Sequence, residues 1–175
     1  MATEQLILVD ADDREVGVKE KLQTHLEGAL HRAFSVFVFD ANRRLLLQRR
    51  APTKYHSGGL WSNTACGHPR PGEPTLVAAH RRLKEEMGFD CELRRAFGFV
   101  YRAELESELV EHEFDHIFVG QYEGALAPDP SEVVDWRWVE WKELADNVRV
   151  EPHRYSSWLN ALIWEHGSQL EMLIP

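Results

Sequence analysis

The chain has 175 residues, of which 29 are Asp or Glu and 20 are Lys or Arg, so its net charge at pH 7 is −9. This charge disfavours a nucleic acid as the main partner, because binding along a phosphate backbone needs a broad basic surface. No apolar run approaches the ~18 residues of a membrane span, the N-terminus lacks a signal-peptide pattern, and two cysteines are too few for a disulfide scaffold. We therefore expect a reduced cytoplasmic protein with one domain, residues 1–175, and a core at about 31–165.

The first third of the chain is predicted to consist mainly of strands. Three segments have the apolar and β-branched composition of strands: residues 5–9, 33–39 and 45–48. The last two are joined by a turn at 40–43, which indicates a hairpin. A loop containing Gly58 and Gly59 follows, and then an extended segment at 61–66 and a turn-rich stretch at 67–72.

A helix is predicted from Pro74 to Gly88, because proline suits a first helical turn and glycine commonly ends a helix. Helical spacing places four apolar residues on one face, which we expect to be buried, and three charged residues away from it. These are Leu76, Ala79, Leu83 and Met87, and Arg82, Glu85 and Glu86 respectively.

The second half of the chain is predicted to add three strands and a last helix. The strands are expected at 97–105, 109–120 and 133–139. The helix is indicated by a buried stripe near the C-terminus, made of Tyr155, Trp158, Leu159, Leu162 and Ile163. Because strands outnumber helices and are partly joined as hairpins, the expected class is α/β, with a mixed β-sheet sandwiched between α-helices.

The most specific local pattern begins at Gly67 and ends at Phe89. It resembles the Nudix box, G-x5-E-x7-R-E-U-x-E-E-x-G-U, at every fixed position except one, where Arg82 replaces a glutamate. Such a loop and helix gather carboxylates that hold Mg²⁺ against a diphosphate. Arg82 removes one metal ligand and adds a phosphate-binding cation, which disfavours multi-metal hydrolysis. The alternative is an ordinary solvated helix face with an Arg82–Glu86 ion pair.

Two glutamates and three histidines form a second, dispersed set. Glu111 and Glu113 are two apart in a predicted strand, so their side chains share one face. With His25, His31 and His68 they would make an octahedral set for Mn²⁺ or Mg²⁺, with Zn²⁺ as a further candidate. Spacing alone does not bring these five residues together, and each histidine taken singly is more typical of a surface or hydrogen-bonded residue.

Cys66 lies beside a turn, in the tripeptide Cys66-Gly67-His68. A buried, inert cysteine is one interpretation, and a catalytic thiol facing an acid or base in a polar pocket is the other. A structural zinc site is disfavoured because the chain has one other cysteine and no C-x-x-C pair.

Four motifs together resemble one family within the Nudix superfamily, the type I isopentenyl-diphosphate isomerases. They are Ala33-Phe34-Ser35, the tract from Trp61 to Pro69 (WSNTACGHP), Tyr101-Arg102-Ala103 and Glu111-His112-Glu113. The match runs from about Leu6 to Trp164. The resemblance implies a Nudix-like fold and an enzyme that interconverts isopentenyl and dimethylallyl diphosphates, by protonation and deprotonation through a carbocation-like intermediate.

The resemblance also implies a role for each matched residue. The catalytic pair falls on Cys66 and Glu113, and the active-site aromatic residues fall on Tyr101 and Trp158. The metal ligands fall on His25, His31, His68, Glu111 and Glu113. A second metal, a Mg²⁺ that bridges to the diphosphate, is implied to be held by Glu86 and the backbone carbonyl of Cys66. The diphosphate-binding residues fall on Lys21, Arg50, Lys54 and Arg82. Taken without the resemblance, Trp158 is typical of a core aromatic residue, Tyr101 of an ordinary strand residue, and the four cations of surface charges.

Two other functions remain open at this point. One is a Nudix pyrophosphohydrolase of a nucleoside diphosphate derivative, which would depend on Glu85 and Glu86 and not on Cys66. The other is a non-catalytic domain that binds prenyl or nucleotide diphosphates. For the isomerase we expect a monomer whose partner is a small prenyl diphosphate, and in it His112, His116 and His153 are interpreted as structural.

Overall fold

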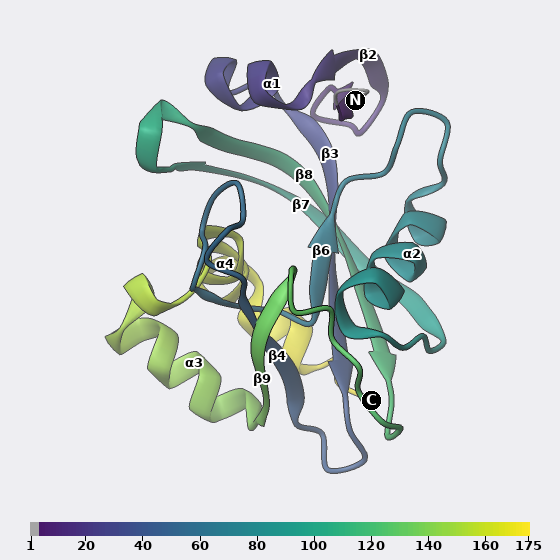
Figure 1. Ribbon diagram of the computed structural model, residues 1–175, viewed down its shortest axis with the longest axis vertical. Helices are drawn as coiled ribbons and strands as arrows, with labels where there is room; N and C mark the ends of the chain where they lie inside the picture. The colour runs from purple at the N-terminus through teal and green to yellow at the C-terminus, as the bar shows by residue number, and fades with distance from the viewer. Residues whose placement is uncertain (1–3) are drawn as a thin grey trace.

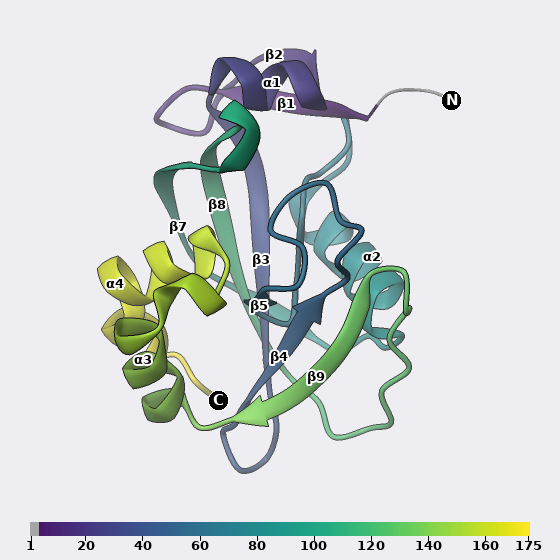
Figure 2. The same cartoon turned by 60° about the vertical axis from the view of Figure 1, so that its left-hand side comes forward.

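A mixed β-sheet runs through the centre of the molecule, with helices on both of its faces (Figures 1 and 2). The computed structural model describes residues 4–175. The strands are β1 Gln5–Val9, β2 Glu15–Glu20, β3 His31–Phe39, β4 Leu45–Arg50, β5 Trp61–Ser62, β6 Ala65–Gly67, β7 Leu93–Glu104, β8 Val110–Gln121 and β9 Val133–Val139. The helices are α1 Lys21–Glu27, α2 Thr75–Met87, α3 Trp141–Val150 and α4 Ser157–Glu171, with short 3₁₀ turns η1 Glu106–Glu108 and η2 Pro152–Arg154.

Strand β3 is the central element of the sheet. It pairs in parallel with β8, which places His31 opposite Glu113, and antiparallel with β6, which places Ser35 opposite Cys66. Strand β8 continues the sheet to β7, where Glu113 lies opposite Tyr101. Because paired residues on neighbouring strands share a face, the register brings all five of these residues to the same side of the sheet.

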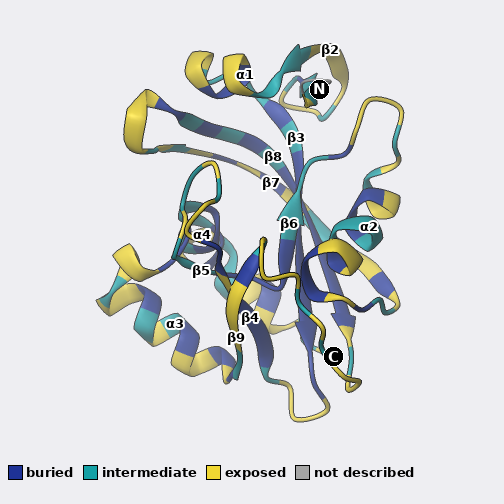
Figure 3. Ribbon diagram, viewed as in Figure 1, coloured by how far each residue is buried: buried dark blue, intermediate teal, exposed yellow. Residues whose placement is uncertain are grey.

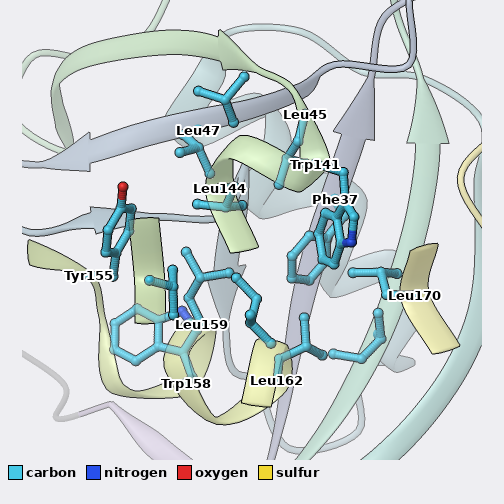
Figure 4. Close-up of a cluster of buried hydrophobic side chains, with 14 of the residues drawn as sticks. Phe37, Leu45, Leu47, Trp141, Leu144, Tyr155, Trp158, Leu159, Leu162 and Leu170 are labelled. Carbon is cyan, nitrogen blue, oxygen red and sulfur yellow. The ribbon is translucent and has the colours of Figure 1, made fainter. Parts of the chain in front are cut away.

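The two faces of β3 contribute to two separate hydrophobic clusters. Phe37 and Phe39 pack with α3 and α4, in the cluster that Figure 4 shows, and Val36 and Val38 pack with α2 on the opposite face. Figure 3 shows the corresponding pattern, with the sheet buried and the outer faces of the helices exposed. The predicted α/β arrangement, a mixed sheet sandwiched between helices, is confirmed.

Helix α2 occupies the predicted segment and ends at Gly88, which has a φ of +73°. A Cβ on Gly88 would lie 2.1 Å from the carbonyl oxygen of Ala127, so only glycine fits there. The predicted apolar face is wrong in two places, because Leu76 is 42% exposed and Glu86 is only 2% exposed. The helix is rotated so that Glu86 points inward, where Arg82 and Gln48 hydrogen-bond to its carboxylate.

Three elements were not predicted: β2, α1 and α3. Helix α1 is short, and its apolar residues Leu22 and Leu26 are about half exposed, so no apolar stripe marks it. Its limits come from its ends: the Glu20 carboxylate accepts a hydrogen bond from the Gln23 amide at 3.0 Å, and Gly28 follows with a φ of +62°. Within residues 4–175, no helix has both the length and the apolar composition that crossing a bilayer requires.

Candidate active site

A pocket of about 910 Å³ opens on the side of the sheet that carries Cys66 and Glu113, and extends around the end of the short strand β6 towards α2. Nine of the predicted site residues line it: Lys21, Arg50, Lys54, Cys66, His68, Arg82, Glu111, Glu113 and Trp158. The other four, His25, His31, Glu86 and Tyr101, are buried and contact residues of this wall. The fold therefore brings all thirteen predicted residues to one region.

Three imidazoles converge at one end of the pocket. His25 lies in the last turn of α1, His31 begins β3, and His68 follows β6; each offers a ring nitrogen, and these nitrogens lie within 4.8 Å of one another. The Nδ1 atoms of His25 and His31 lie 2.7 and 2.9 Å from the carbonyl oxygens of Lys21 and Ala29. Since a carbonyl only accepts, each Nδ1 carries the proton and each Nε2 presents a lone pair to the cluster.

Glu111 and Glu113 complete this group, which we call the His/Glu cluster (His25, His31, His68, Glu111 and Glu113). An oxygen of Glu113 lies 2.9 Å from Nε2 of His68 and 3.4 Å from Nε2 of His31, and its other oxygen accepts a hydrogen bond from the Tyr101 hydroxyl at 2.6 Å. Glu111 lies 3.4 Å from Nε2 of His25.

The pKa values of the two carboxyl groups in the cluster are shifted in opposite directions. Burial opposes ionisation of Glu113, but the close imidazoles of His31 and His68 outweigh it and hold the pKa of Glu113 well below its usual range. Burial, together with the negative charge of Glu113, raises the pKa of Glu111. The two close carboxylates therefore compete for ionisation.

The donor set fits a divalent cation. The Nε2 atoms of His25 and His31 and one oxygen of Glu111 are buried and have no hydrogen-bond partner. Buried polar atoms are almost always satisfied, so unpartnered lone pairs that point at one another indicate a site that can bind a cation. Imidazole nitrogens with carboxylate oxygens suit Mn²⁺, Zn²⁺ and related ions, and these residues do not select one of them.

Cys66 lies on β6, in the pocket wall between the His/Glu cluster and α2. The Nη1 atom of Arg50 is 3.8 Å from its sulfur. Burial, with a smaller contribution from the charge of Glu86, raises the pKa of the Cys66 thiol to about 12. The thiol therefore carries its proton at neutral pH and is a poor nucleophile.

Trp158, in the first turn of α4, belongs both to the pocket wall and to the core cluster of Figure 4. Its indole Nε1 donates hydrogen bonds to Ser62 Oγ at 3.0 Å and Asn63 Oδ1 at 2.9 Å, which fixes the ring. The guanidinium of Arg50 lies 5.0 Å from the ring centroid. The core interpretation and the active-site interpretation of this residue are therefore compatible.

Three of the four predicted diphosphate-binding cations already have carboxylate partners. Lys21 pairs with Glu4 at 2.9 Å, Lys54 pairs with Glu132, and Arg82 contacts three carboxylates. The three carboxylates that contact Arg82 belong to Glu85 at 2.8 Å, Glu86 at 2.7 Å and Glu132 at 3.0 Å. The ion pair between Arg82 and Glu86 is present, but it is buried and not part of a solvated face.

Glu86 is a buried residue of α2, the helix that packs against β6. Arg82 hydrogen-bonds to one of its carboxylate oxygens, and Gln48 hydrogen-bonds to the other. Gly67 leaves room for the side chain of Arg82, because a Cβ on residue 67 would lie only 3.2 Å from Cγ of Arg82. A Mg²⁺ at this position would need most of its ligands from the substrate and water, which is how Mg²⁺ is commonly bound beside phosphates.

Sequence reasoning missed two residues of the pocket, His56 and Glu132. Nε2 of His56 lies 3.0 Å from an oxygen of Glu111, and Glu132 contacts both Lys54 and Arg82. Both residues lie in loops, where no periodic pattern predicts which way a side chain points. His112 and His116 agree with the structural interpretation, since they contact the Gly28 carbonyl and Asp13 respectively.

Comparison with known proteins places the chain in a family. A model described as NUDIX domain matches residues 29–159. The chain is 57% identical over 160 residues to Isopentenyl-diphosphate Delta-isomerase 2 of Aromatoleum aromaticum, covering 91% of this chain and 85% of that protein. It is 56% identical over 164 residues to Isopentenyl-diphosphate Delta-isomerase of Burkholderia multivorans, covering 94% and 93%.

Solved structures support the fold independently. DR0079 from Deinococcus radiodurans superposes with a TM-score of 0.75 at 19% identity, over 91% of this chain and 97% of that one. The MutT protein from Methanosarcina mazei Go1 superposes with a TM-score of 0.65 at 14% identity, over 81% and 95%. At these identities the likeness shows the architecture alone.

Proposed function

Since this chain belongs to the NUDIX domain family and, within it, to the isopentenyl-diphosphate isomerases, we propose that it interconverts isopentenyl and dimethylallyl diphosphates by moving a carbon–carbon double bond. The observation that carries the proposal is one pocket that holds a protonated thiol, Cys66, and a carboxylate tied to a metal-binding cluster, Glu113. The reaction requires two such groups, one to give a proton and one to take a proton.

The chemistry accounts for the two groups. A proton adds to the terminal methylene carbon of isopentenyl diphosphate, positive charge develops on the neighbouring tertiary carbon, and a proton leaves the carbon on the other side. Water would capture this cation, so the site has to exclude water and offer no nucleophile that adds irreversibly. A thiol with a pKa raised to about 12 meets the second condition better than a thiolate would. General acid–base groups typically contribute about 10²–10⁴-fold each.

Trp158 and Tyr101 assist this pair. The face of the indole of Trp158 attracts the developing positive charge, and such cation–π contacts are worth up to about 2 kcal/mol in desolvated sites. Its two hydrogen bonds, to Ser62 and Asn63, hold the ring in place while the charge forms. The Tyr101 hydroxyl donates a hydrogen bond to the Glu113 carboxyl, so it orients that carboxyl and can relay a proton to or from it.

The cofactors follow from the donor sets. The His/Glu cluster would hold a divalent metal, for which Mn²⁺, Mg²⁺ and Zn²⁺ are all candidates. A cation bound there would polarise the Glu113 carboxyl and make it a stronger acid than a free glutamic acid. Glu86 and the backbone carbonyl of Cys66 would hold a Mg²⁺ beside the diphosphate.

The diphosphate group is held by Lys21, Arg50, Lys54 and Arg82. Charge-assisted bonds from these side chains to phosphate oxygens are short and strong, and Arg50 also reaches the thiol and the indole. Tight retention matters because the diphosphate is not consumed, and an allylic diphosphate loses this group readily when the bridging oxygen is protonated. We propose that the enzyme works as a cytoplasmic monomer, in which both cysteines are free thiols.

Hydrolysis of a nucleoside diphosphate derivative is the less favoured function. It would rely on Glu85 and Glu86 as metal ligands, and the guanidinium of Arg82 contacts both carboxylates. A Nudix hydrolase has a glutamate at that position in its box, and this chain has a cation. The isomerase is therefore the function that the charges of α2 support.

An exchange experiment tests the proposal. Metal-loaded protein is incubated with isopentenyl diphosphate in D₂O, and the products are followed by NMR and mass spectrometry. We expect dimethylallyl diphosphate that carries deuterium and no release of phosphate. Folded, metal-loaded protein that converts none of the substrate would refute the function, and release of phosphate from nucleoside diphosphate derivatives would favour the hydrolase instead.

A further inference from the structure

The side chains of the His/Glu cluster are held from behind by neighbouring groups. Backbone carbonyls fix His25 and His31, and the Tyr101 hydroxyl fixes Glu113. Glu111 turns one oxygen towards His25, and Nε2 of His56 lies 3.0 Å from the other. We propose that His56 is a positioning residue of the metal site, which holds Glu111 in the orientation that binding requires; the inference rests on the metal site of the proposed function.

The surroundings of His56 fix its ring. Its side chain is 12% exposed and lies among aromatic rings, edge-on to Trp158 with centroids 5.9 Å apart and next to His25 at 5.7 Å. Its backbone carbonyl accepts a hydrogen bond from Nη2 of Arg50 at 3.1 Å. The loop between β4 and β5 therefore presents this imidazole to Glu111 from a fixed position.

The chemistry of the ring favours positioning over direct metal binding. Nδ1 of His56 lies 3.3 Å from the Ser57 hydroxyl, which can donate to it and leave the ring proton on Nε2. An Nε2–H group beside a carboxylate oxygen donates to that oxygen and has no lone pair for a metal. His25 and His31 have the opposite arrangement, with Nδ1 donating to a carbonyl and Nε2 free.

The expected effect is on metal affinity. Loss of a group that hydrogen-bonds to a metal ligand typically lowers metal affinity 10–100-fold, because the ligand is no longer held in the orientation that binds the metal. We therefore expect His56→Ala to weaken Mn²⁺ binding by about 10–100-fold. His56→Gln keeps an N–H donor at a similar reach and should retain most of the affinity. The control is His153→Ala, since His153 is an exposed histidine on η2.

Mn²⁺ titration followed by EPR of the free ion measures this effect without any turnover. Wild-type affinity in His56→Ala would overturn the proposal, and so would a His56→Gln variant that binds as weakly as His56→Ala. Pulsed EPR of bound Mn²⁺ gives a second readout: the number of coordinated imidazole nitrogens should be the same in both variants as in the wild type. Loss of one nitrogen would make His56 a ligand and refute the positioning role.

These outcomes are separable from failure of the proposed function. A wild-type protein that binds Mn²⁺ but does not isomerise isopentenyl diphosphate refutes the function and leaves the role of His56 standing. A wild-type protein that binds no Mn²⁺ refutes the inference itself. If His56→Ala does not fold, as judged by circular dichroism, His56→Gln and its nitrogen count decide the question.

Discussion

The two ends of the pocket differ in whether their polar side chains already have partners of opposite charge or hydrogen-bonding type. At the His/Glu cluster the side chains of His25 and His31 are fully buried, and their Nε2 atoms have no hydrogen-bond partner. At the opposite end Lys54 and Arg82 already contact a carboxylate, that of Glu132. One end needs an added cation, whereas the other has to exchange internal partners for phosphate oxygens.

The elements that build the two ends explain this difference. The cluster rests largely on β3 and β8, whose parallel register places His31 opposite Glu113 and leaves little freedom. At the cation end Lys54 lies in the loop after β4 and Arg82 lies on α2. A rigid set of ligands can hold a cation permanently, and side chains on more accessible elements can release one partner and take another. Cys66 lies between the two ends.

The largest effect should come from removing the thiol. We expect Cys66→Ala to lower turnover by at least about 10²–10⁴-fold, because the reaction loses one of its two proton-transfer groups. Binding of Mg²⁺ with pyrophosphate, measured by calorimetry, should survive, since it depends on the cation end. The matched control is Cys91→Ala, which removes the other free thiol. Near-normal turnover in Cys66→Ala would show that the acid–base pair is assigned incorrectly.

The second effect concerns stability and isolates the cluster end. Mn²⁺ at a hundred times its dissociation constant should raise the free energy of unfolding by about 2.7 kcal/mol, because it binds the folded state alone. Thermal denaturation with and without a chelator measures this gain. In His25→Ala the gain at the same Mn²⁺ concentration should be much smaller. An equal gain in the variant would mean that Mn²⁺ binds elsewhere.

The sequence predicts the sheet well and the position of the site in part. The apolar run of β3 and the spacing of Glu111 and Glu113 are local patterns, and both predictions agree with the structure. The helix between Pro74 and Gly88 is predicted equally well, because the proline and the glycine mark its two ends in the sequence. Helices α1 and α3 were not predicted, since α1 has too few residues for an apolar stripe to appear.

The site depends on contacts between distant segments, which local patterns do not contain. His25 was a predicted ligand only through the resemblance, because nothing in the sequence near it indicates that it faces β8. Glu86 was expected at the surface, and its burial depends on Gln48, 38 residues earlier in the chain. The place of His56 follows from the path of the loop that carries it, and only the structure gives that path.

A smaller effect is expected at Trp158, where the pocket and the core overlap. Trp158→Phe keeps a weaker π face, so turnover should fall about tenfold rather than vanish, which corresponds to about 1.4 kcal/mol of lost cation–π attraction. The substitution also leaves Ser62 and Asn63 without their indole partner, which should cost about 1–3 kcal/mol of stability. Turnover and thermal denaturation measure the two effects, with Trp164→Phe as the control on the same helix, where the side chain is exposed. Complete inactivity of a folded Trp158→Phe protein would require a further role for the indole.

The smallest effect tests whether the cation end exchanges partners. Glu132 contacts both Lys54 and Arg82, so Glu132→Gln removes an internal competitor of the diphosphate. Ion pairs of this partly exposed kind are worth about 0.2–1 kcal/mol, so pyrophosphate with Mg²⁺ should bind a few-fold more tightly. Calorimetry measures the change, and Glu27→Gln, which removes the partner of Lys19, is the control. If binding weakens instead, Glu132 holds the two cations in place for the diphosphate, and the cation end is as preformed as the cluster end.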